Sequence, residues 1–300
     1  MRRDRVRSFV RLVAVSLVAL AFAGCARREK PPVPAAEGTA TAADGVSIAY
    51  DVRGAGEPTL VFIHGWCCNR SFWKNQLDAF ARDHQVVSLD LPGHGASGSD
   101  RSAWSIRGLG ADVQAVVEAA GSSRVVLVGH SLGGPVALEA ARLLPGRVVA
   151  VIAIDTLQDV DFVYPPEAVE QMAARFERDF TGTMTQAVRS MFSETSDPAL
   201  VEWVMTSSVG ANHDAAVAIM RGYTTFDMKQ ALSEAKVPVR CLNALPRDEE
   251  GGVPTNVERN RQFGDFDAVM LEGVGHFPML EQPDSFNEKL REMLKALPKS

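Results

Sequence analysis

A glycine-flanked serine between two apolar segments constrains the fold of this chain more than any other feature of its sequence. Gly129-x-Ser131-x-Gly133 follows the apolar run Val125–Val128 and precedes a segment rich in Ala and Leu. The run predicts a buried strand, and the segment after it predicts a helix. A strand, a tight turn and a helix in this order are typical of a nucleophile elbow, which exposes the central serine at the carboxyl edge of a sheet. We therefore predict that Ser131 is a nucleophile at such an edge.

Short apolar runs alternate with helical patterns from Asp44 onward, as expected of parallel strands buried on both faces. The predicted strands are Val46–Val52, Thr59–Ile63, Gln85–Leu89, Arg124–Val128, Val148–Ile154, Val239–Asn243 and Ala268–Leu271. Residues 157–232 break the alternation, because their pattern is helical throughout. The sequence thus predicts an α/β fold with a doubly wound, mostly parallel sheet, formed by 44–156 and 233–300, with 157–232 inserted as a helical cap.

A base must lie within hydrogen-bonding distance of Ser131, because a serine hydroxyl is a weak nucleophile. Histidine suits this role near neutral pH. His276 lies in the segment Gly275–Pro278, after the last predicted strand and before the last predicted helix. This position brings it to the same edge of the sheet as Ser131. We predict that His276 is the general base.

A carboxylate is expected to orient the histidine and to stabilise its charged form. Asp248 is our first choice, because it follows the penultimate predicted strand. Glu249 and Glu250 are alternatives in the same loop. Asp155, at the end of the predicted strand Val148–Ile154, is a second alternative position. These residues leave the identity of the acid open.

Four segments of the chain resemble the α/β hydrolase superfamily, of the lidded serine hydrolase or esterase type. They are Phe62–Trp66, Asp90–Ser97, Gly129–Gly133 and Gly275–Pro278. The resemblance covers residues 44–297 and implies an α/β-hydrolase fold with a triad in the chain order Ser131, Asp248, His276. The loop at Asp248 departs from the family, because Asp-Glu-Glu-Gly-Gly replaces the usual shorter spacing between Asp and Pro.

The resemblance also implies an oxyanion hole, formed by two backbone N–H groups. These belong to Trp66, in the segment with the His-Gly pair, and to Leu132, which follows the nucleophile. Each such donor typically contributes about 3–4 kcal/mol in the transition state. His64 would brace the loop that holds Trp66, and His94 would lie in the turn after the fourth strand.

The activity that the resemblance implies is hydrolysis of carboxylic esters or thioesters through an acyl-enzyme on Ser131, with no cofactor and no metal. The predicted cap holds six of the ten methionines, and Met adapts to varied apolar shapes, so we expect a small-molecule ester with an apolar part. Two alternatives remain open. One is an acyltransferase or cofactor-free perhydrolase with the same triad, and the other is a non-catalytic ligand-binding protein on the same scaffold.

The first 24 residues predict an export signal. Residues 1–11 carry five arginines, and residues 12–24 form a 13-residue apolar run that is shorter than an ordinary membrane span of about 20 residues. Small residues before Cys25 are similar to a bacterial lipobox, although an ordinary cleaved signal remains an alternative. We predict that Cys25 is lipidated, that 25–43 form a flexible tether, and that the protein lies in the bacterial cell envelope, anchored to a membrane.

The charge of the chain excludes nucleic acid as an expected partner. The full sequence carries a net charge of -6, and removal of residues 1–24 leaves 26 Lys and Arg against 36 Asp and Glu, a net charge of -10. A chain this acidic has no electrostatic footprint for a polyanion. The sequence does not specify an oligomeric state.

The cysteines other than Cys25 are predicted to be buried free thiols. They are Cys67, Cys68 and Cys241, and the last lies in a strand expected far across the sheet from the first two. A bridge between Cys67 and Cys241 is therefore disfavoured, since bridged Cα atoms lie within about 7 Å of each other. A bridge between the adjacent Cys67 and Cys68 is the alternative.

Overall fold

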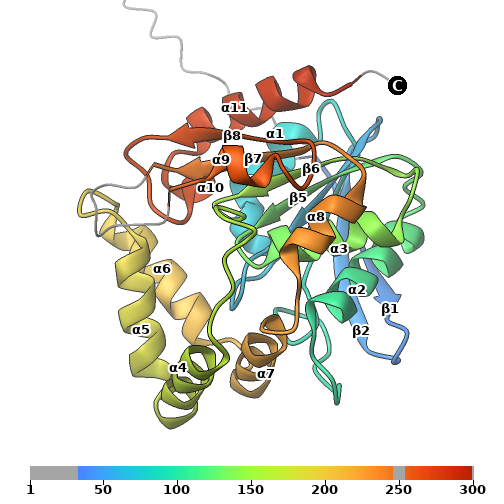
Figure 1. The fold of residues 1–300 in the computed structure, drawn as a ribbon. Helices are drawn as coiled ribbons and strands as arrows, with labels where there is room; N and C mark the ends of the chain where they lie inside the picture. The colour runs from blue at the N-terminus through green and yellow to red at the C-terminus, as the bar shows by residue number, and fades with distance from the viewer. Residues whose placement is uncertain (1–32, 246–253, 299–300) are drawn as a thin grey trace, which may run out of the picture. The chain divides into compact units, whose positions relative to one another are not determined.

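An eight-stranded sheet forms the centre of the described part of the chain, which comprises residues 33–245 and 254–298 of a computed structural model (Figure 1). The strands lie in the order β1-β2-β4-β3-β5-β6-β7-β8. Strands β3 to β8 pair in parallel, and β1 and β2 extend the sheet by antiparallel pairing. The strands are β1 Ala35–Thr41, β2 Ser47–Arg53, β3 Thr59–Ile63, β4 Val86–Leu89, β5 Val125–His130, β6 Val148–Ile154, β7 Val239–Ala244 and β8 Phe266–Leu271.

Helices cover both faces of this sheet. Figure 1 shows α1 and α11 on one side and α2, α3 and α8 on the other, in agreement with the two separate clusters of buried side chains. The helices are η1 Arg70–Trp73 (a 3-10 helix), α1 Lys74–Phe80, α2 Ile106–Ala119, α3 Gly133–Leu143, α4 Pro166–Arg178, α5 Phe180–Met191, α6 Pro198–Val209, α7 His213–Tyr223, α8 Met228–Ala235, α9 Val257–Asn260, α10 Pro278–Glu281 and α11 Pro283–Ala296.

Strand β3 shows why the central strands are apolar at every position. Leu60 and Phe62 pack into the cluster under α1 and α11, and Val61 and Ile63 pack into the cluster under α2 and α3. All four side chains are fully buried. Since full burial of such a side chain contributes roughly 1.5–3 kcal/mol, a strand of this kind is stable only between two helical layers.

Strand β1 corrects one of our predictions. Residues 25–43 are predicted as a flexible tether, but Ala35–Thr41 pair with β2 over seven residues. The sequence of this strand does not alternate between apolar and polar residues, and Ala40 is its one buried residue. Its pairing instead rests on backbone hydrogen bonds and on the ring of Tyr50, which occupies the space that a Cβ on Gly38 would need.

The segment predicted as the cap contains helices α4 to α7 and the first part of α8. Helix α6 begins where the sequence indicates, since Asp197 accepts a hydrogen bond from the N–H of Ala199 at 2.9 Å, and Pro198 occupies the first helical position. Helix α8 continues to Ala235 and packs against α3. The predicted boundary at residue 232 therefore falls inside a helix that packs on the core.

The predicted export signal and Cys25 lie outside the described residues, as does the predicted acid Asp248. Within the described residues, no helix combines the length and the apolar character needed to cross a bilayer. The three described cysteines, Cys67, Cys68 and Cys241, are buried and free, as predicted. Burial raises the pKa of each thiol, which therefore stays protonated near neutral pH.

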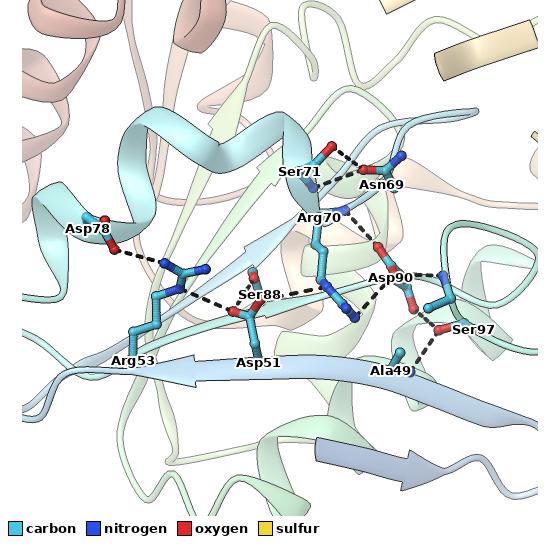
Figure 2. Close-up of polar contacts among 11 residues, drawn as sticks. Ala49, Asp51, Arg53, Asn69, Arg70, Ser71, Asp78, Ser88, Asp90 and Ser97 are labelled. Carbon is cyan, nitrogen blue, oxygen red and sulfur yellow. Dashed lines mark hydrogen bonds and ion pairs between the residues drawn. The ribbon is translucent and has the colours of Figure 1, made fainter. Parts of the chain in front are cut away.

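A buried ionic network joins β2, β4 and η1 (Figure 2). The carboxylate of Asp90, which is 2% exposed, accepts hydrogen bonds from the backbone N–H of Arg70 at 2.7 Å and from that of Ala96 at 2.9 Å. The guanidinium of Arg70 lies 3.3 Å from Asp90 and 3.7 Å from Asp51, which also accepts a hydrogen bond from Ser88 at 2.8 Å. The network fixes the loop after β4 against the start of η1.

We expect Asp90→Ala to lower the free energy of unfolding by about 3 kcal/mol, because it leaves the backbone N–H groups of Arg70 and Ala96 without their buried acceptor and removes one of the two carboxylates beside the Arg70 guanidinium. In a domain of this size, that loss corresponds to a fall in Tm of roughly 6–12 °C, measured by thermal denaturation. Asp78→Ala is the control, because its ion pair with Arg53 at 2.9 Å is partly exposed and contributes less than about 1 kcal/mol. Equal shifts in Tm for the two variants would contradict the prediction.

Candidate active site

The predicted nucleophile lies in a strained turn between β5 and α3. Ser131 has a φ of +50°, in the left-handed region that non-glycine residues rarely adopt. Its backbone N–H donates to the carbonyl of Ile154 in β6 at 2.9 Å, and its own carbonyl accepts from Gly134 at 2.9 Å. These hydrogen bonds hold the strained backbone at the carboxyl ends of two neighbouring parallel strands.

The two motif glycines are required by close backbone packing. A Cβ on Gly129 would overlap the backbone of Gly133, and a Cβ on Gly133 would overlap the carbonyl of Ile63 at the end of β3. The start of α3 therefore packs directly against β3 and β5. Only glycine at both positions allows this approach, which explains the spacing on either side of Ser131.

His276 lies on the loop between β8 and α10, at the same edge of the sheet. Its Nδ1 lies 2.6 Å from Oδ2 of Asp155, and both side chains are largely buried. With Nδ1–H donating to the carboxylate, the lone pair of the neutral ring is on Nε2. His276, Asp155 and Ser131 line the same cavity.

Asp155 directly follows β6 and also has a left-handed backbone, with a φ of +46°. Its Oδ1 accepts a hydrogen bond from the N–H of Ala244 at 2.9 Å, and its own N–H donates to the carbonyl of Leu242 at 3.1 Å. Both partners belong to β7. The carboxylate is thus fixed on one oxygen by the neighbouring strand and presents the other oxygen to His276.

The position beside His276 Nδ1 is therefore taken by Asp155, one of the alternatives to Asp248. Asp248, our first choice, lies in residues 246–253, outside the described residues, together with Glu249 and Glu250. One feature of the sequence could have identified Asp155 as the acid. It is the charged residue that directly follows the apolar run Val148–Ile154. The geometry of the described residues favours Asp155 as the acid.

The two residues predicted to form the oxyanion hole line the same cavity as Ser131. In the described part of the chain, the backbone N–H groups of Trp66 and Leu132 donate to no acceptor. Leu132 is the N-cap of α3, where N–H groups are unpaired and the helix dipole favours negative charge. The indole Nε1 of Trp66 donates to the carbonyl of Ala216 in α7 at 2.9 Å, which ties this loop to the cap.

Two buried histidines brace the loop that carries Trp66. His64 Nε2 accepts from the N–H of Leu91 at 2.9 Å, and its Nδ1–H donates to the carbonyl of Gly65 at 2.8 Å. His94 Nε2 accepts from the N–H of Cys67 at 3.1 Å. Burial lowers the pKa of His64 to about 3 and also lowers that of His94, so both rings stay neutral and can accept these hydrogen bonds.

The cavity above Ser131 has a volume of about 770 Å³ and a largely apolar wall. None of its lining side chains in the described part of the chain is Lys or Arg. Within the same residues, no group of three or more His, Cys, Asp and Glu side chains could hold a metal ion. The apolar wall comes mainly from the cap and the segment leading into it, and includes Phe162, Tyr164, Val169, Met172, Met220 and Tyr223.

Comparison with known proteins agrees with this geometry. The model of the Alpha/beta hydrolase family matches residues 60–289. Pimeloyl-(acyl-carrier protein) methyl ester esterase of Xanthomonas campestris pv. campestris is 30% identical over 262 residues, which cover 83% of this chain and 99% of that enzyme. The esterase of the same name from Pectobacterium carotovorum subsp. carotovorum is 26% identical over 266 residues, with the same shares covered. An esterase of Thermogutta terrifontis has the same fold, with a TM-score of 0.75 at 24% identity over 87% of this chain and 98% of that one.

Proposed function

The chain belongs to the alpha/beta hydrolase family and is a hydrolase, and we propose that it cleaves carboxylic esters through an acyl-enzyme on Ser131. One observation carries the proposal. The cavity that exposes Ser131 on a strained turn also exposes His276, whose Nδ1 is bound to Asp155 at 2.6 Å. A nucleophile, a base and an orienting carboxylate together in one cavity are what acyl transfer requires.

In the first step, Ser131 Oγ attacks the carbonyl carbon of the ester, and His276 Nε2 takes the proton from the hydroxyl. Asp155 keeps the proton on Nδ1 and stabilises the imidazolium that forms. The carbonyl oxygen becomes an oxyanion, which accepts hydrogen bonds from the N–H groups of Trp66 and Leu132. Each donor contributes about 3–4 kcal/mol to the transition state.

In the second step, the tetrahedral intermediate collapses and the bond to the leaving oxygen breaks. His276 gives its proton to the leaving alcohol, and the acyl group remains on Ser131. A water molecule then attacks the acyl-enzyme, with His276 Nε2 again taking a proton. The second tetrahedral intermediate then collapses, the bond between the acyl carbon and Ser131 Oγ breaks, and the carboxylic acid leaves while His276 returns the proton to Oγ.

The substrate that fits this cavity is an uncharged small ester with an apolar acyl or alcohol part. The described wall is apolar and contains no cation that would bind an anionic group. Residues 157–232, which include the cap, carry eleven Asp and Glu against five Lys and Arg. This acidic surface disfavours an anionic partner protein, so we propose a free ester even though the named relatives act on a carrier-bound one.

We expect native protein to hydrolyse p-nitrophenyl esters, with the highest kcat/KM for acyl chains longer than acetyl, because the cavity wall is apolar. Ser131→Ala should lower kcat by about 10⁴-fold or more, since it removes the nucleophile. Ser233, which is half-buried on α8 and does not line the cavity, supplies a matched control, and Ser233→Ala should leave the rates unchanged. Equal rates for native protein and Ser131→Ala would refute the assignment. Added alcohol acceptors in the same assay separate hydrolysis from acyl transfer, and thioester substrates test whether this bond is also cleaved.

The acid is tested by comparing Asp155→Asn with Asp248→Asn. We expect Asp155→Asn to lower kcat by about 10³–10⁴-fold, because an amide at this position favours the wrong tautomer of His276. Asp248→Asn should keep a kcat within about twofold of the native value, since Nδ1 of His276 already has its acceptor. The opposite ranking of the two variants would return the role to Asp248.

We also propose that the mature protein begins at a lipidated Cys25 in the cell envelope, a proposal that rests on the sequence of residues 1–25 alone. Cys25→Ser should move the protein from the membrane fraction to the soluble fraction, because the lipid is the proposed anchor. Fractionation of cells that express the native chain and the variant measures this. Membrane retention of Cys25→Ser would count against lipidation.

A further inference from the structure

The backbone around His276 is held by groups outside its own loop. The N–H groups of Gly275 and Phe277 both donate to Oε1 of Glu281, at 2.9 Å and 3.2 Å. The N–H of His276 donates to the carbonyl of Met191, at the end of α5, at 2.8 Å. Three consecutive N–H groups are thus fixed by one side chain of α10 and by one backbone group of the cap.

The second oxygen of Glu281 reaches the cap. Its Oε2 accepts a hydrogen bond from the hydroxyl of Ser196 at 2.7 Å. Ser196 lies between α5 and α6, and its Oγ also accepts a hydrogen bond from the N–H of Ser193 at 2.9 Å. One carboxylate therefore bridges the histidine loop and the connection between two cap helices.

In the described part of the chain, the carboxylate of Glu281 binds two backbone N–H groups and one hydroxyl instead of a cation. Hydrogen bonds to an ionised acceptor are roughly twice as strong as those between neutral groups. The charge of Glu281 therefore strengthens the hydrogen bonds that hold the loop of His276 in place.

We propose that Glu281 is a positioning residue, which sets the alignment of His276 with Ser131. Through its hydrogen bond to Ser196, it also makes that alignment depend on the position of the cap. The proposal rests on the proposed function, because it assigns His276 as the base. An error of about 1 Å in the placement of a catalytic group can cost about 10²-fold in rate. Loss of the Glu281 carboxylate frees the residues on both sides of His276, and loss of Ser196 frees the carboxylate from the cap.

The first test compares Glu281→Ala, Glu281→Gln and, as the control, Glu288→Ala, whose side chain is exposed on α11. Glu281→Ala should lower kcat by about 10²-fold with KM within about twofold, because the apolar cavity is untouched. Glu281→Gln keeps one carbonyl acceptor and should recover most of this loss. Glu288→Ala should match native protein. Titration of reactive Ser131 with a fluorophosphonate counts the folded sites, so that a lower yield of folded protein is not mistaken for a lower kcat.

The second test measures the link to the cap by a double-mutant cycle. Ser196→Ala should lower kcat about threefold in the native background and have no effect in the Glu281→Ala background, since the carboxylate that transmits it is gone. Ser190→Ala, at an exposed serine of α5, is the matched control. Additive effects of Ser196→Ala and Glu281→Ala would overturn the link to the cap.

The outcomes separate this proposal from the proposed function. A native kcat in Glu281→Ala, with Ser131→Ala inactive, would overturn the positioning role and leave the acyl-enzyme mechanism intact. Loss of folded sites in Glu281→Ala, with a native kcat per titrated site, would also overturn it, because the residue would then act on stability alone. Activity in Ser131→Ala would overturn the proposed function itself.

Discussion

The site depends on how closely the turn at Ser131 approaches β3. Because Gly133 has no side chain, the first turn of α3 contacts the end of β3, and the helix begins at the carboxyl edge of the sheet. This approach brings the N–H of Leu132 and the loop of Trp66 to the same cavity. A Cβ at either motif glycine would move the start of α3 away from β3, and would separate Ser131 and Leu132 from the loop that holds Trp66.

Ser131 and Asp155 adopt left-handed backbone conformations that cost of order 1–3 kcal/mol each. The cost is offset by the surrounding sheet, whose central strands are buried on both faces. Ser131 directly follows β5, and Asp155 directly follows β6. The backbone N–H of each residue donates a hydrogen bond to the neighbouring strand, which holds the residue in place. The parallel strands thus hold Ser131 and Asp155 in backbone conformations that orient their side chains differently from those of a regular strand.

The sequence predicts much of this arrangement, because much of it depends on local patterns. Continuous Val and Ile runs indicate the parallel strands, and the glycines around Ser131 specify the turn. Ser285 and Glu288 have the spacing of a capping box, which predicts an N-cap at Ser285, but the last helix begins at Pro283 and its N-cap is Gln282. Strand β1 escapes prediction because its side chains are small and its pairing is made by the backbone.

The acid and Glu281 are harder to predict, because the contacts that give them their roles leave no pattern in the neighbouring sequence. Asp155 meets His276 across 121 positions, and nothing near Asp155 specifies that contact. Glu281 is close to His276 in the chain, but its partners are backbone N–H groups, which carry no signature in the residue types. Contacts of this kind become visible only when the fold brings the loop, α10 and the cap together.

The path of the chain through the cap limits how the cap can be exchanged. The chain leaves the sheet at Asp155 and enters the cap directly, and the end of α5 supplies the acceptor for the N–H of His276. A cap grafted from a relative would replace Met191 and Ser196, and would leave the histidine loop without these two contacts. Under the role proposed for Glu281, the cap helps to position His276, so a chimera with a different cap must reproduce both contacts to keep the native kcat.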